Sequence, residues 1–337
     1  MVKVAVVILN WNGLQHLQHY LPRVVATTPE ADIVVADNGS TDGSVEWLQS
    51  AMPSVKTICL DRNYGFAEGY NRALEILRSE SSYDAYLLLN SDVESTEGWL
   101  SPLAELLESN EKIAVVVPKL LDDKNRSRFE YAGAAGGYID YLGYPFCRGR
   151  ILNNIEEDRG QYNTAREVMW GSGAAFLIRA EVFHKLGGFA PEFFAHQEEI
   201  DLCWRVWLAG YRVVAEPRSV VYHLGGATLS STSPQKVFYN HRNNLAMLFR
   251  CAPSSQRVTV ATLRPILDLA AAMVYLLQGK GAYAKAVYRA WCDFLAWHKR
   301  LSCERKQIRA NVKGEAPIYR GSIILRYILS KRTFQDL

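Results

Sequence analysis

The chain has 337 residues, enough for one large α/β unit with an appendage, and 49% of them are hydrophobic while 22% are charged. This composition is typical of a folded globular protein and excludes a disordered chain, a collagen and a multi-span membrane protein. The net charge of +3 combines two unlike parts, because residues 1–239 hold 21 Lys and Arg against 30 Asp and Glu, whereas residues 240–337 hold 17 against 5.

The first part of the chain alternates strands with helices. Short β-branched and apolar runs predict buried strands, and the segments between them have helical periodicity. The predicted strands cover residues 2–9, 33–36, 55–60, 85–89 and 113–117, and the predicted helices cover residues 14–26, 44–49, 67–78 and 99–108. This order predicts a mostly parallel sheet that binds its ligand at the carboxyl ends of the strands.

The second part of the chain predicts more loop and then long helices. Residues 131–149 are rich in Gly and Tyr, and residues 153–166 are polar, so both are expected to be loops. The further strands are predicted at residues 171–178, 213–215 and 220–223, and the further helices at residues 180–186, 198–208, 235–250, 258–277 and 281–301, with a short apolar and basic segment at 323–332. We expect a catalytic domain over residues 1–235 and a basic, mainly helical region over residues 236–337.

The sequence also bears on the cellular compartment. Its six cysteines form no C-x-x-C pair, which suits a reducing cytosol. The apolar run at residues 2–9 lacks a small-residue cleavage site, so we expect a first strand and no signal peptide. The most apolar later stretch, residues 266–277, contains Asp268 and is shorter than the roughly 20 residues of a membrane span, so no transmembrane helix is expected.

Polar clusters follow four of the predicted strands, at the edge where such a sheet binds its ligand. Each cluster alone is also what an ordinary turn or helix cap contains. Their common position favours a nucleotide site, in which Asp37 accepts hydrogen bonds from a base or ribose and Asp92 holds Mg²⁺ or Mn²⁺ on phosphates. The clusters are Asn10-Trp11-Asn12, Asp37-Asn38-Gly39-Ser40-Thr41-Asp42, Asp61-Arg62-Asn63 and Asn90-Ser91-Asp92.

The segment that begins Asn63-Tyr64-Gly65 opens a helix with two glycines. Glycine permits close backbone approach, and a helix N-terminus offers N–H groups to anions. The chain has neither a G-x-G-x-x-G fingerprint nor a P-loop, which argues against NAD-dependent oxidation and ATP hydrolysis.

Three carboxylates, Glu198, Glu199 and Asp201, open the helix predicted at residues 198–208. The helix dipole and an ion pair from Asp201 to Arg205 account for one or two of them. A carboxylate at a helix N-terminus is expected to stay ionised at neutral pH, which suits a general base that takes a proton from an attacking alcohol.

His223 ends a predicted strand and is followed by Gly225 and Gly226. A lone histidine is more often structural than a ligand. Because His223 ends a strand beside two glycines, a role in binding a metal or a pyrophosphate has the same weight as a structural role.

Together and in this order, these segments resemble the family-2 glycosyltransferases, and within them the rhamnosyltransferase-like branch that builds bacterial cell-surface polysaccharide. The resemblance extends over residues 4–228 and includes Gly171-Ser172-Gly173. It implies a GT-A fold, a nucleotide-diphosphate-sugar donor, a glycan or polyprenyl-linked acceptor, and inversion at the anomeric carbon. It also implies an enzyme of the cell envelope that acts in the cytoplasm or at the cytoplasmic face of the membrane.

The resemblance assigns roles by motif. Asp37 would hold the nucleotide, and Asp92 with His223 would hold a divalent cation, Mn²⁺ or Mg²⁺. Glu199 occupies the position of the base, where the family usually has Asp, and this departure leaves Glu198 and Asp201 as alternatives. Asn90 replaces the first Asp of an Asp-x-Asp motif, as it does in the rhamnosyltransferase-like branch. The candidate donor-binding residues besides Asp37 are Asn10, Asn12, Asn63, Gly65, Asn90, Ser91, Trp170 and Gly171.

Other functions stay open beside this one. The same fold could serve a sugar-nucleotide-binding or scaffold protein without catalysis. A nucleotidyltransferase would normally carry a glycine-rich, cationic loop after its first strand, where this chain has Asn10-Trp11-Asn12-Gly13. No nucleic-acid partner is expected, because no nucleic-acid motif accompanies the basic tail. The donor sugar, the acceptor and the oligomeric state stay open, and rhamnose follows from the branch alone.

The basic tail has two interpretations. Its helices could pack on the catalytic domain and expose a solvated basic face. They could equally form a docking surface for anionic lipid, which would suit a lipid-linked acceptor.

Overall fold

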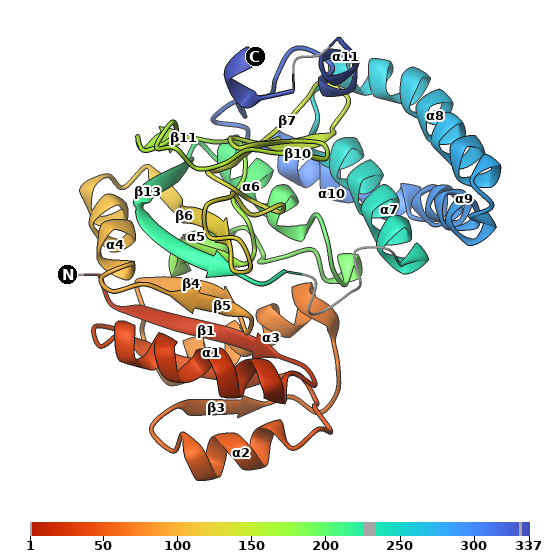
Figure 1. Cartoon of the computed structure of the whole chain (residues 1–337). Helices are drawn as coiled ribbons and strands as arrows, with labels where there is room; N and C mark the ends of the chain where they lie inside the picture. The colour runs from red at the N-terminus through yellow and green to blue at the C-terminus, as the bar shows by residue number, and fades with distance from the viewer. Residues whose placement is uncertain (1, 226–232, 330–331) are drawn as a thin grey trace.

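The computed structural model describes residues 2–225, 233–329 and 332–337 (Figure 1). Gly226 and the Ser330-Lys331 pair, on which parts of the sequence interpretation depend, lie outside the described residues. The main sheet has nine strands in the order β11-β13-β6-β12-β4-β1-β2-β3, with β5 paired to β13. Its strands are β1 (Val4–Asn10), β2 (Asp32–Asp37), β3 (Lys56–Cys59), β4 (Ala85–Asn90), β5 (Val93–Ser95), β6 (Ile113–Asp122), β11 (Arg166–Glu167), β12 (Ala175–Arg179) and β13 (Arg212–His223).

The predicted parallel core is confirmed, because β1 pairs in parallel with both β2 and β4, and β2 pairs in parallel with β3. Its central strands β1 and β4 are buried on both faces, as their continuous apolar runs require. One face packs on α1, α2 and α4, and the other packs on α3, α5 and α6. These helices are α1 (Leu14–Thr27), α2 (Ser44–Ala51), α3 (Gly65–Glu80), α4 (Leu100–Ser109), α5 (Ala180–Lys185) and α6 (Glu198–Leu208).

The predicted elements between residues 120 and 225 need three corrections. The strand expected at residues 171–178 begins only at Ala175, and it runs antiparallel to β4 and β6. The strands expected at residues 213–215 and 220–223 are one strand, β13, with an irregularity between Glu216 and Val220. The segments expected to be loops also form a second, antiparallel sheet, because short extended pieces pair across tight turns. Its strands are β7 (Gly137–Ile139), β8 (Pro145–Cys147), β9 (Arg150–Ile151) and β10 (Asn154–Ile155).

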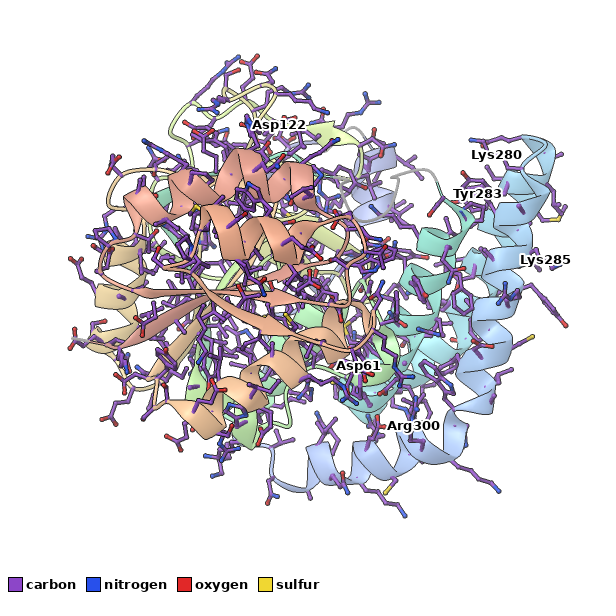
Figure 2. All side chains as sticks on the ribbon, turned by 90° about the horizontal axis from the view of Figure 1, so that it is seen from below. Asp61, Asp122, Lys280, Tyr283, Lys285 and Arg300 are labelled. Carbon is purple, nitrogen blue, oxygen red and sulfur yellow. The ribbon has the colours of Figure 1, made fainter. Side chains whose placement is uncertain are left out.

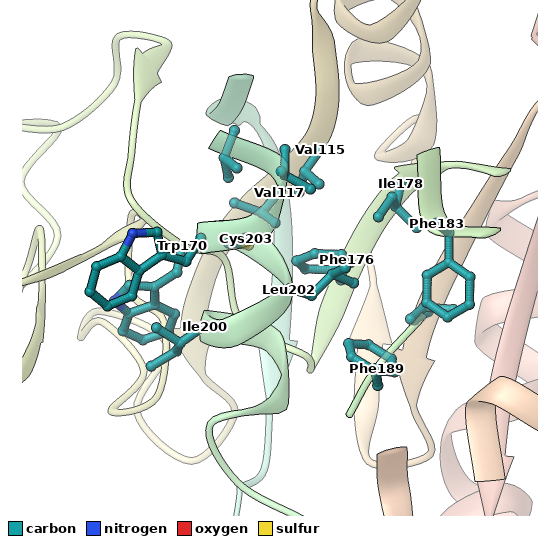
Figure 3. Close-up of a cluster of buried hydrophobic side chains, with 14 of the residues drawn as sticks. Val115, Val117, Trp170, Phe176, Ile178, Phe183, Phe189, Ile200, Leu202 and Cys203 are labelled. Carbon is teal, nitrogen blue, oxygen red and sulfur yellow. The ribbon is translucent and has the colours of Figure 1, made fainter. Parts of the chain in front are cut away.

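An apolar cluster fills the space between the sheet and α6 (Figure 3). Phe176 of β12 and Val117 of β6 contribute from the sheet, and Ile200 and Leu202 contribute from α6. All four side chains are at most 2% exposed, so the start of α6 is fixed relative to the strand ends.

The C-terminal region consists of helices on the side of the molecule opposite α2 (Figure 1). The helix expected at residues 281–301 is two helices, which meet at Trp297, and the Trp297 ring lies under the guanidinium of Arg242 at 4.4 Å. The helices of this region are α7 (Pro234–Cys251), α8 (Ser254–Leu277), α9 (Gly281–Ala296), α10 (His298–Ala310) and α11 (Ile323–Ile328). Short 3-10 helices lie at Pro191–Phe193 and Phe334–Asp336.

Helix α8 departs from a further expectation. It has 24 residues, and an 18-residue window within it has a mean hydropathy of 1.6, so it is long and apolar enough to cross a membrane. The sequence argument considered only residues 266–277 and overlooked the uncharged Val, Thr, Ala and Leu residues at 258–263, which extend the apolar face toward the start of the helix. Only 11% of the apolar window is buried.

Candidate active site

Three strands bring their last residues to one edge of the sheet. Asn10 ends β1, Asp37 ends β2 and Asn90 ends β4, and Asn10 lies opposite Asp37 in register. The Asn10 Nδ2 donates a hydrogen bond of 3.0 Å to Asp37 Oδ1. The polar clusters of these strands therefore meet at the carboxyl ends of the sheet, as their positions predicted.

Asp37 is held as a buried acceptor at this edge. It is 2% exposed, and its Oδ2 accepts the backbone N–H of Ser40 over 2.9 Å. The neighbouring Asn12 is exposed and accepts the Thr41 N–H with its Oδ1 over 2.8 Å. Because a carboxylate oxygen has two lone pairs, Asp37 can still accept a hydrogen bond from a ligand.

The N-terminus of α3 is closed by another part of the chain. The N–H groups of Phe66 and Ala67 both donate to the carbonyl oxygen of Phe194, over 2.6 and 3.2 Å. Gly65 has φ +77°, and a Cβ there would lie 2.5 Å from the Phe194 ring. The Asn63 Oδ1 accepts the Gly65 N–H over 2.8 Å. The expectation that this helix end offers its N–H groups to an anion is therefore wrong for Phe66 and Ala67, because a carbonyl oxygen already uses them.

Asp92 and His223 lie side by side. The Asp92 Oδ1 is 3.3 Å from the His223 Nε2, and the Asn90 Nδ2 is 3.4 Å from the same nitrogen. The pairing of β5 with β13 brings them together, since His223 lies opposite Val93 in that pair. On the other side of the ring, Glu130 Oε1 is 3.5 Å from His223 Nδ1.

Asp92 and His223 fit a divalent cation that takes only one or two ligands from the protein. Among the described residues, no group of three or more His, Cys, Asp or Glu side chains could hold a metal ion. A Mg²⁺ or Mn²⁺ ion on a nucleotide usually takes one or two protein ligands, with substrate phosphates and water as the others. Adjacent ligands at about 2.1 Å from such an ion lie about 3 Å apart, as Asp92 and His223 do. The pair therefore fits an ion that the diphosphate completes.

The charges around His223 are strongly coupled. Burial favours its neutral ring, but the carboxylates of Asp92 and Glu130 outweigh burial and raise the pKa of His223 to about 10. Burial in turn opposes the charge of Asp92, yet His223 lowers the pKa of that carboxyl below its ordinary value. Asp92 is thus an ionised carboxylate, as a metal ligand must be, and a divalent cation bound here would displace the proton of His223, because an imidazole binds a metal only in its neutral form.

Glu198 and Glu199 begin α6 with unpaired oxygens. The Oε2 atoms of both side chains and the Nε2 of His196 are buried without a hydrogen-bond partner. Burial and the neighbouring Glu199 raise the pKa of Glu198 well above its ordinary value, and burial raises the pKa of Glu199 from 4.5 to about 7. The helix N-terminus was expected to keep such a carboxylate ionised at neutral pH, but desolvation outweighs the helix N–H groups and leaves Glu199 only partly ionised there. A carboxyl that titrates near pH 7 is still well suited to general-base catalysis.

The loop in front of α6, residues 193–197, is strained. Phe194, His196 and Gln197 have φ values of 61°, 70° and 72°, in the left-handed region. Such a conformation costs a residue other than glycine about 1–3 kcal/mol and persists only where its surroundings impose it. We call residues 193–197 the base loop.

Helix α7 holds the base loop in place. The Asn243 side-chain amide lies 3.0, 3.0 and 2.7 Å from the carbonyl oxygens of Phe193, Ala195 and His196. The next residue, Asn244, donates to the Gln197 Oε1 over 3.1 Å. The buried amide of Asn243 thus satisfies carbonyl groups of the strained loop, of which that of Phe193 also accepts the Ala195 N–H.

Asp201 differs from the two glutamates because both of its oxygens are paired. It is fully buried, and its Oδ2 accepts from Arg205 Nε over 2.9 Å, which confirms the predicted i,i+4 pair. Its Oδ1 accepts from Arg250 Nε over 2.7 Å. Burial opposes the charge, but the two guanidinium groups lower the pKa of Asp201. Its oxygens therefore join α6 to α7 and have the character of a structural ion pair.

Trp170 and Gly171 lie behind this region. Trp170 is 3% exposed, and its indole N–H donates to the Tyr138 carbonyl over 2.9 Å (Figure 3). A Cβ on Gly171 would lie 2.1 Å from a methyl group of Val117. Trp170 and Gly171 are thus closely packed and fix the local backbone. Ser91, beside Asp92, is partly exposed at the edge of the sheet.

Two charged residues of the site escaped the sequence analysis. Glu130 lies between the strand predicted at residues 113–117 and the loop predicted from residue 131, and no spacing relates it to His223. Lys236 is in the first turn of α7, where it is near enough to Glu130 and His196 for their charges to interact. Burial and Lys236 together lower the pKa of His196 to about 4. The Arg242-Asn243-Asn244 run, polar in a buried stretch of helix, was a signal that could have been found.

The amino-acid sequence of this chain is similar to those of known glycosyltransferases. The family model described as Glycosyl transferase family 2 matches residues 5–187. N-acetylglucosaminyl-diphospho-decaprenol L-rhamnosyltransferase of Mycobacterium tuberculosis (strain CDC 1551 / Oshkosh) is 27% identical over 232 residues, which cover 65% of this chain and 75% of that protein. Rhamnosyltransferase WbbL of Escherichia coli (strain K12) is 26% identical over 163 residues, which cover 48% of this chain and 61% of that protein.

Solved structures have the same fold. A structure of GalNAc-T7 with UDP, GalNAc and Mn²⁺ aligns with a TM-score of 0.61 at 18% identity, over 79% of this chain and 51% of that one. A structure of S. aureus TarS 1-349 with UDP-GlcNAc aligns with a TM-score of 0.57 at 15% identity, over 97% of this chain and 92% of that one. The expected GT-A fold, a mostly parallel sheet flanked by helices with further C-terminal helices, is confirmed.

Proposed function

This chain belongs to glycosyl transferase family 2, and from that membership we propose that it transfers a sugar, with inversion, from a nucleotide-diphosphate-sugar to a hydroxyl group of a growing surface polysaccharide. One observation supports the proposal most. Glu198 and Glu199, which open α6, each carry a buried Oε2 atom without a hydrogen-bond partner, and Asp92 lies 3.3 Å from His223 at the edge of the sheet. The chain therefore offers carboxylates for proton transfer as well as a pair for a cation.

The donor would bind at the carboxyl ends of β1, β2 and β4. Asp37 would accept a hydrogen bond from the nucleoside, supported by Asn10 and by the exposed Asn12. Asn63, Gly65, Asn90 and Ser91 would border the same site, with Trp170 and Gly171 fixing the backbone behind it. Asp92 and His223 would hold a divalent cation, Mn²⁺ or Mg²⁺, which neutralises charge that develops on the departing diphosphate.

Glu199 is the proposed general base. Its unpaired Oε2 would take the proton of the acceptor hydroxyl while that oxygen forms a bond to the anomeric carbon. The bond from the anomeric carbon to the diphosphate oxygen breaks on the opposite side, and the nucleoside diphosphate leaves with the electron pair. Glu198 is the alternative base, whereas Asp201 is the least suitable because two arginines occupy its oxygens.

Rhamnose is the proposed donor sugar, and a sugar on a polyprenyl diphosphate is the proposed acceptor. The support is the similarity to a rhamnosyltransferase whose name states a decaprenol-linked acceptor. An acceptor of this kind is held in a membrane, and nucleotide sugars are made in the cytoplasm. We therefore propose that the enzyme works at the cytoplasmic face of the inner membrane.

A screen of the purified chain against nucleotide sugars tests the proposal. Thermal shift and donor hydrolysis, each with and without Mn²⁺ or Mg²⁺, identify the donor, and transfer of a radiolabelled sugar to a polyprenyl-linked acceptor then tests turnover. We expect a rhamnosyl donor to be used with added cation. Binding without transfer to any acceptor would instead support the non-catalytic alternative, in which a sugar-nucleotide-binding protein retains this fold.

A further inference from the structure

Helix α8 buries polar side chains against the rest of the chain and exposes large apolar ones. Its polar residues Gln256, Arg264 and Asp268 are each at most 2% exposed and face the rest of the chain. Its large apolar residues face away from the protein, among them Ile266 at 64% exposure and Leu269 at 65%. A surface helix normally has the reverse arrangement, with its apolar stripe on the core.

The outward face of α8 is long and uncharged. None of the exposed side chains between residues 258 and 277, all of which the structure describes, carries a charge. Soluble monomers rarely expose so extended an apolar patch unless another apolar phase covers it. The exposed residues of this face are Val258, Ala261, Thr262, Leu263, Pro265, Ile266, Leu269, Ala270, Met273, Val274, Leu276 and Leu277.

Helix α11 lies near the start of α8 (Figure 1). Both helices attach to the same short segment, because Gln256 of α8 donates to the Tyr141 carbonyl and the Ile323 N–H, at the start of α11, donates to Asp140. Helix α11 exposes Leu325 and Ile328, at 57% and 69%. We call the exposed residues of α8 together with Leu325, Ile328 and Leu329 the apolar face.

Cations predominate on the surface of the C-terminal region. In the described part of residues 233–337, exposed Lys and Arg greatly outnumber exposed carboxylates, of which the structure describes two, Glu315 and Asp336. Lys280 and Lys285 lie at the turn after α8 and on α9, at the far end of the helical region from Arg300 (Figure 2). The exposed cations are Lys280, Lys285, Arg289, Lys299, Arg300, Lys306, Lys313, Arg320, Arg326 and Arg332.

We propose that the apolar face docks on an anionic membrane, with α8 lying in the plane of the interface and its exposed side chains among the acyl chains. Charge complementarity supports lipid as the partner, because the basic residues would attract anionic headgroups while the uncharged face enters the bilayer. A second copy of this chain would bring two surfaces of the same sign together, and like charges repel.

Two contacts favour docking over spanning. The Arg264 guanidinium donates to the Leu142 carbonyl over 2.9 Å, and Trp291 of α9 donates to Asp268 over 3.0 Å. To cross a bilayer, α8 would have to leave α7 and α9. It would then carry Arg264 and Asp268 into the acyl region, where ionised side chains are costly.

The inner side of α8 connects to the catalytic residues. Arg264 Nη1 donates to Asn244 Oδ1 over 2.6 Å, and Asn244 donates in turn to Gln197, which precedes Glu198. Docking would therefore hold the base loop at a set position relative to the bilayer. This consequence rests on the proposed function, since it matters only if the acceptor is carried by a lipid, whereas the docking itself does not.

Vesicle flotation of the full chain without donor or acceptor tests the proposal. We expect the protein to float with vesicles of phosphatidylcholine and phosphatidylglycerol, and to bind pure phosphatidylcholine at least about tenfold less. L269E places a charge on the apolar face and should reduce binding by about tenfold or more. V312E adds the same charge at an exposed apolar residue outside that face and should leave binding unchanged.

Further outcomes separate the alternatives. Equal binding of L269E and wild type, or no binding of wild type to the anionic vesicles, would overturn the proposal. A wild-type dimer in solution that L269E dissociates would overturn it in favour of a second copy. Release of the bound protein by alkaline carbonate supports docking, and resistance to carbonate would show a spanning helix instead. Because these readouts need no catalysis, a failed docking test leaves the proposed transfer reaction untouched, and an inactive enzyme could still dock.

Discussion

The Asp92 carboxylate and the His223 imidazole face each other at the edge of the sheet, with Oδ1 and Nε2 3.3 Å apart. Asp92 follows β4, and His223 ends the long strand β13. The two residues meet because β5, which begins directly after Asp92, pairs with the end of β13. Glu130 approaches the opposite side of the ring and completes a line of two carboxylates and one imidazole. The fold thus gathers two carboxylates and an imidazole where the proposed cation would lie.

The first prediction concerns that cation. D92N should weaken Mn²⁺ binding in the presence of nucleoside diphosphate by about tenfold or more, which corresponds to about 1.4 kcal/mol. Proton relaxation enhancement of water by Mn²⁺ measures this binding without turnover. D84N removes an exposed carboxylate that accepts the Lys3 N–H at the opposite end of the sheet and should bind Mn²⁺ as the wild type does. Equal Mn²⁺ affinity in all three proteins would contradict the assignment of Asp92.

The second prediction identifies the base. E199Q keeps the size of the side chain but cannot accept a proton, so the turnover number should fall by about 10²- to 10⁴-fold while the dissociation constant of the donor changes little. E198Q is the matched control, one residue away at the same helix end. A larger fall in E198Q than in E199Q, measured in the same transfer assay, would move the role of base to Glu198.

The third prediction follows from the pKa of Glu199, which burial raises to about 7. Because the base must be ionised, the turnover number should rise with pH up to about 7 and then level off. Folding should respond in the opposite direction. The folded chain keeps the Glu199 proton to about pH 7, whereas an unfolded glutamate loses it near 4.5, so the stabilisation is complete below 4.5 and is lost as the pH rises through 7.

Chemical denaturation across this pH range checks the folding effect. The free energy of unfolding should fall between pH 4.5 and 7 in the wild type by more than in E199Q, which lacks the titrating group. Identical pH profiles of stability in the two proteins would show that Glu199 does not titrate in this range.

The fourth prediction concerns Asn243, a positioning residue. N243A removes the amide near three carbonyl oxygens of the base loop, so the loop should relax from its strained conformation. We expect the turnover number to fall by about tenfold or more while KM for the donor changes little, because the Asn243 side chain bonds the loop and Arg242 and none of the proposed donor-binding residues. Q307A, on the exposed side of α10, should change neither parameter. A change in KM alone would argue against a role in placing the base.

The fifth prediction separates Asp201 from the glutamates. R250M leaves the Asp201 carboxylate buried with one partner fewer, and should lower the free energy of unfolding by about 3–5 kcal/mol. R300M breaks ion pairs of a partly exposed arginine with Glu192 and Glu304 and should cost less than about 1 kcal/mol. Denaturant unfolding of both variants measures the difference. Similar losses in the two variants would show that the Asp201 pair is not essential to the fold.

The sequence predicted the elements of the sheet domain well because the signals for these elements are local. The apolar run that forms β1 and the periodicity of α6 are each contained in a few consecutive residues. The polar residues Asn10, Asp37 and Asn90 were predictable as neighbours for the same reason, since parallel strands end at one edge. The small sheet of β7 to β10 was missed because its strands are two or three residues long and depend on pairing with one another.

The charge states of the site and the orientation of α8 were decided by the tertiary structure. Sequence alone placed Glu198, Glu199 and Asp201 together, but only the fold brings Arg250 to Asp201, 49 residues away, and leaves the two glutamates buried without such a partner. Likewise, the sequence of α8 contains both polar and apolar residues, and only its packing shows that the polar ones face inward. Desolvation and ion pairing depend on which distant groups surround a side chain, and that information is absent from local periodicity.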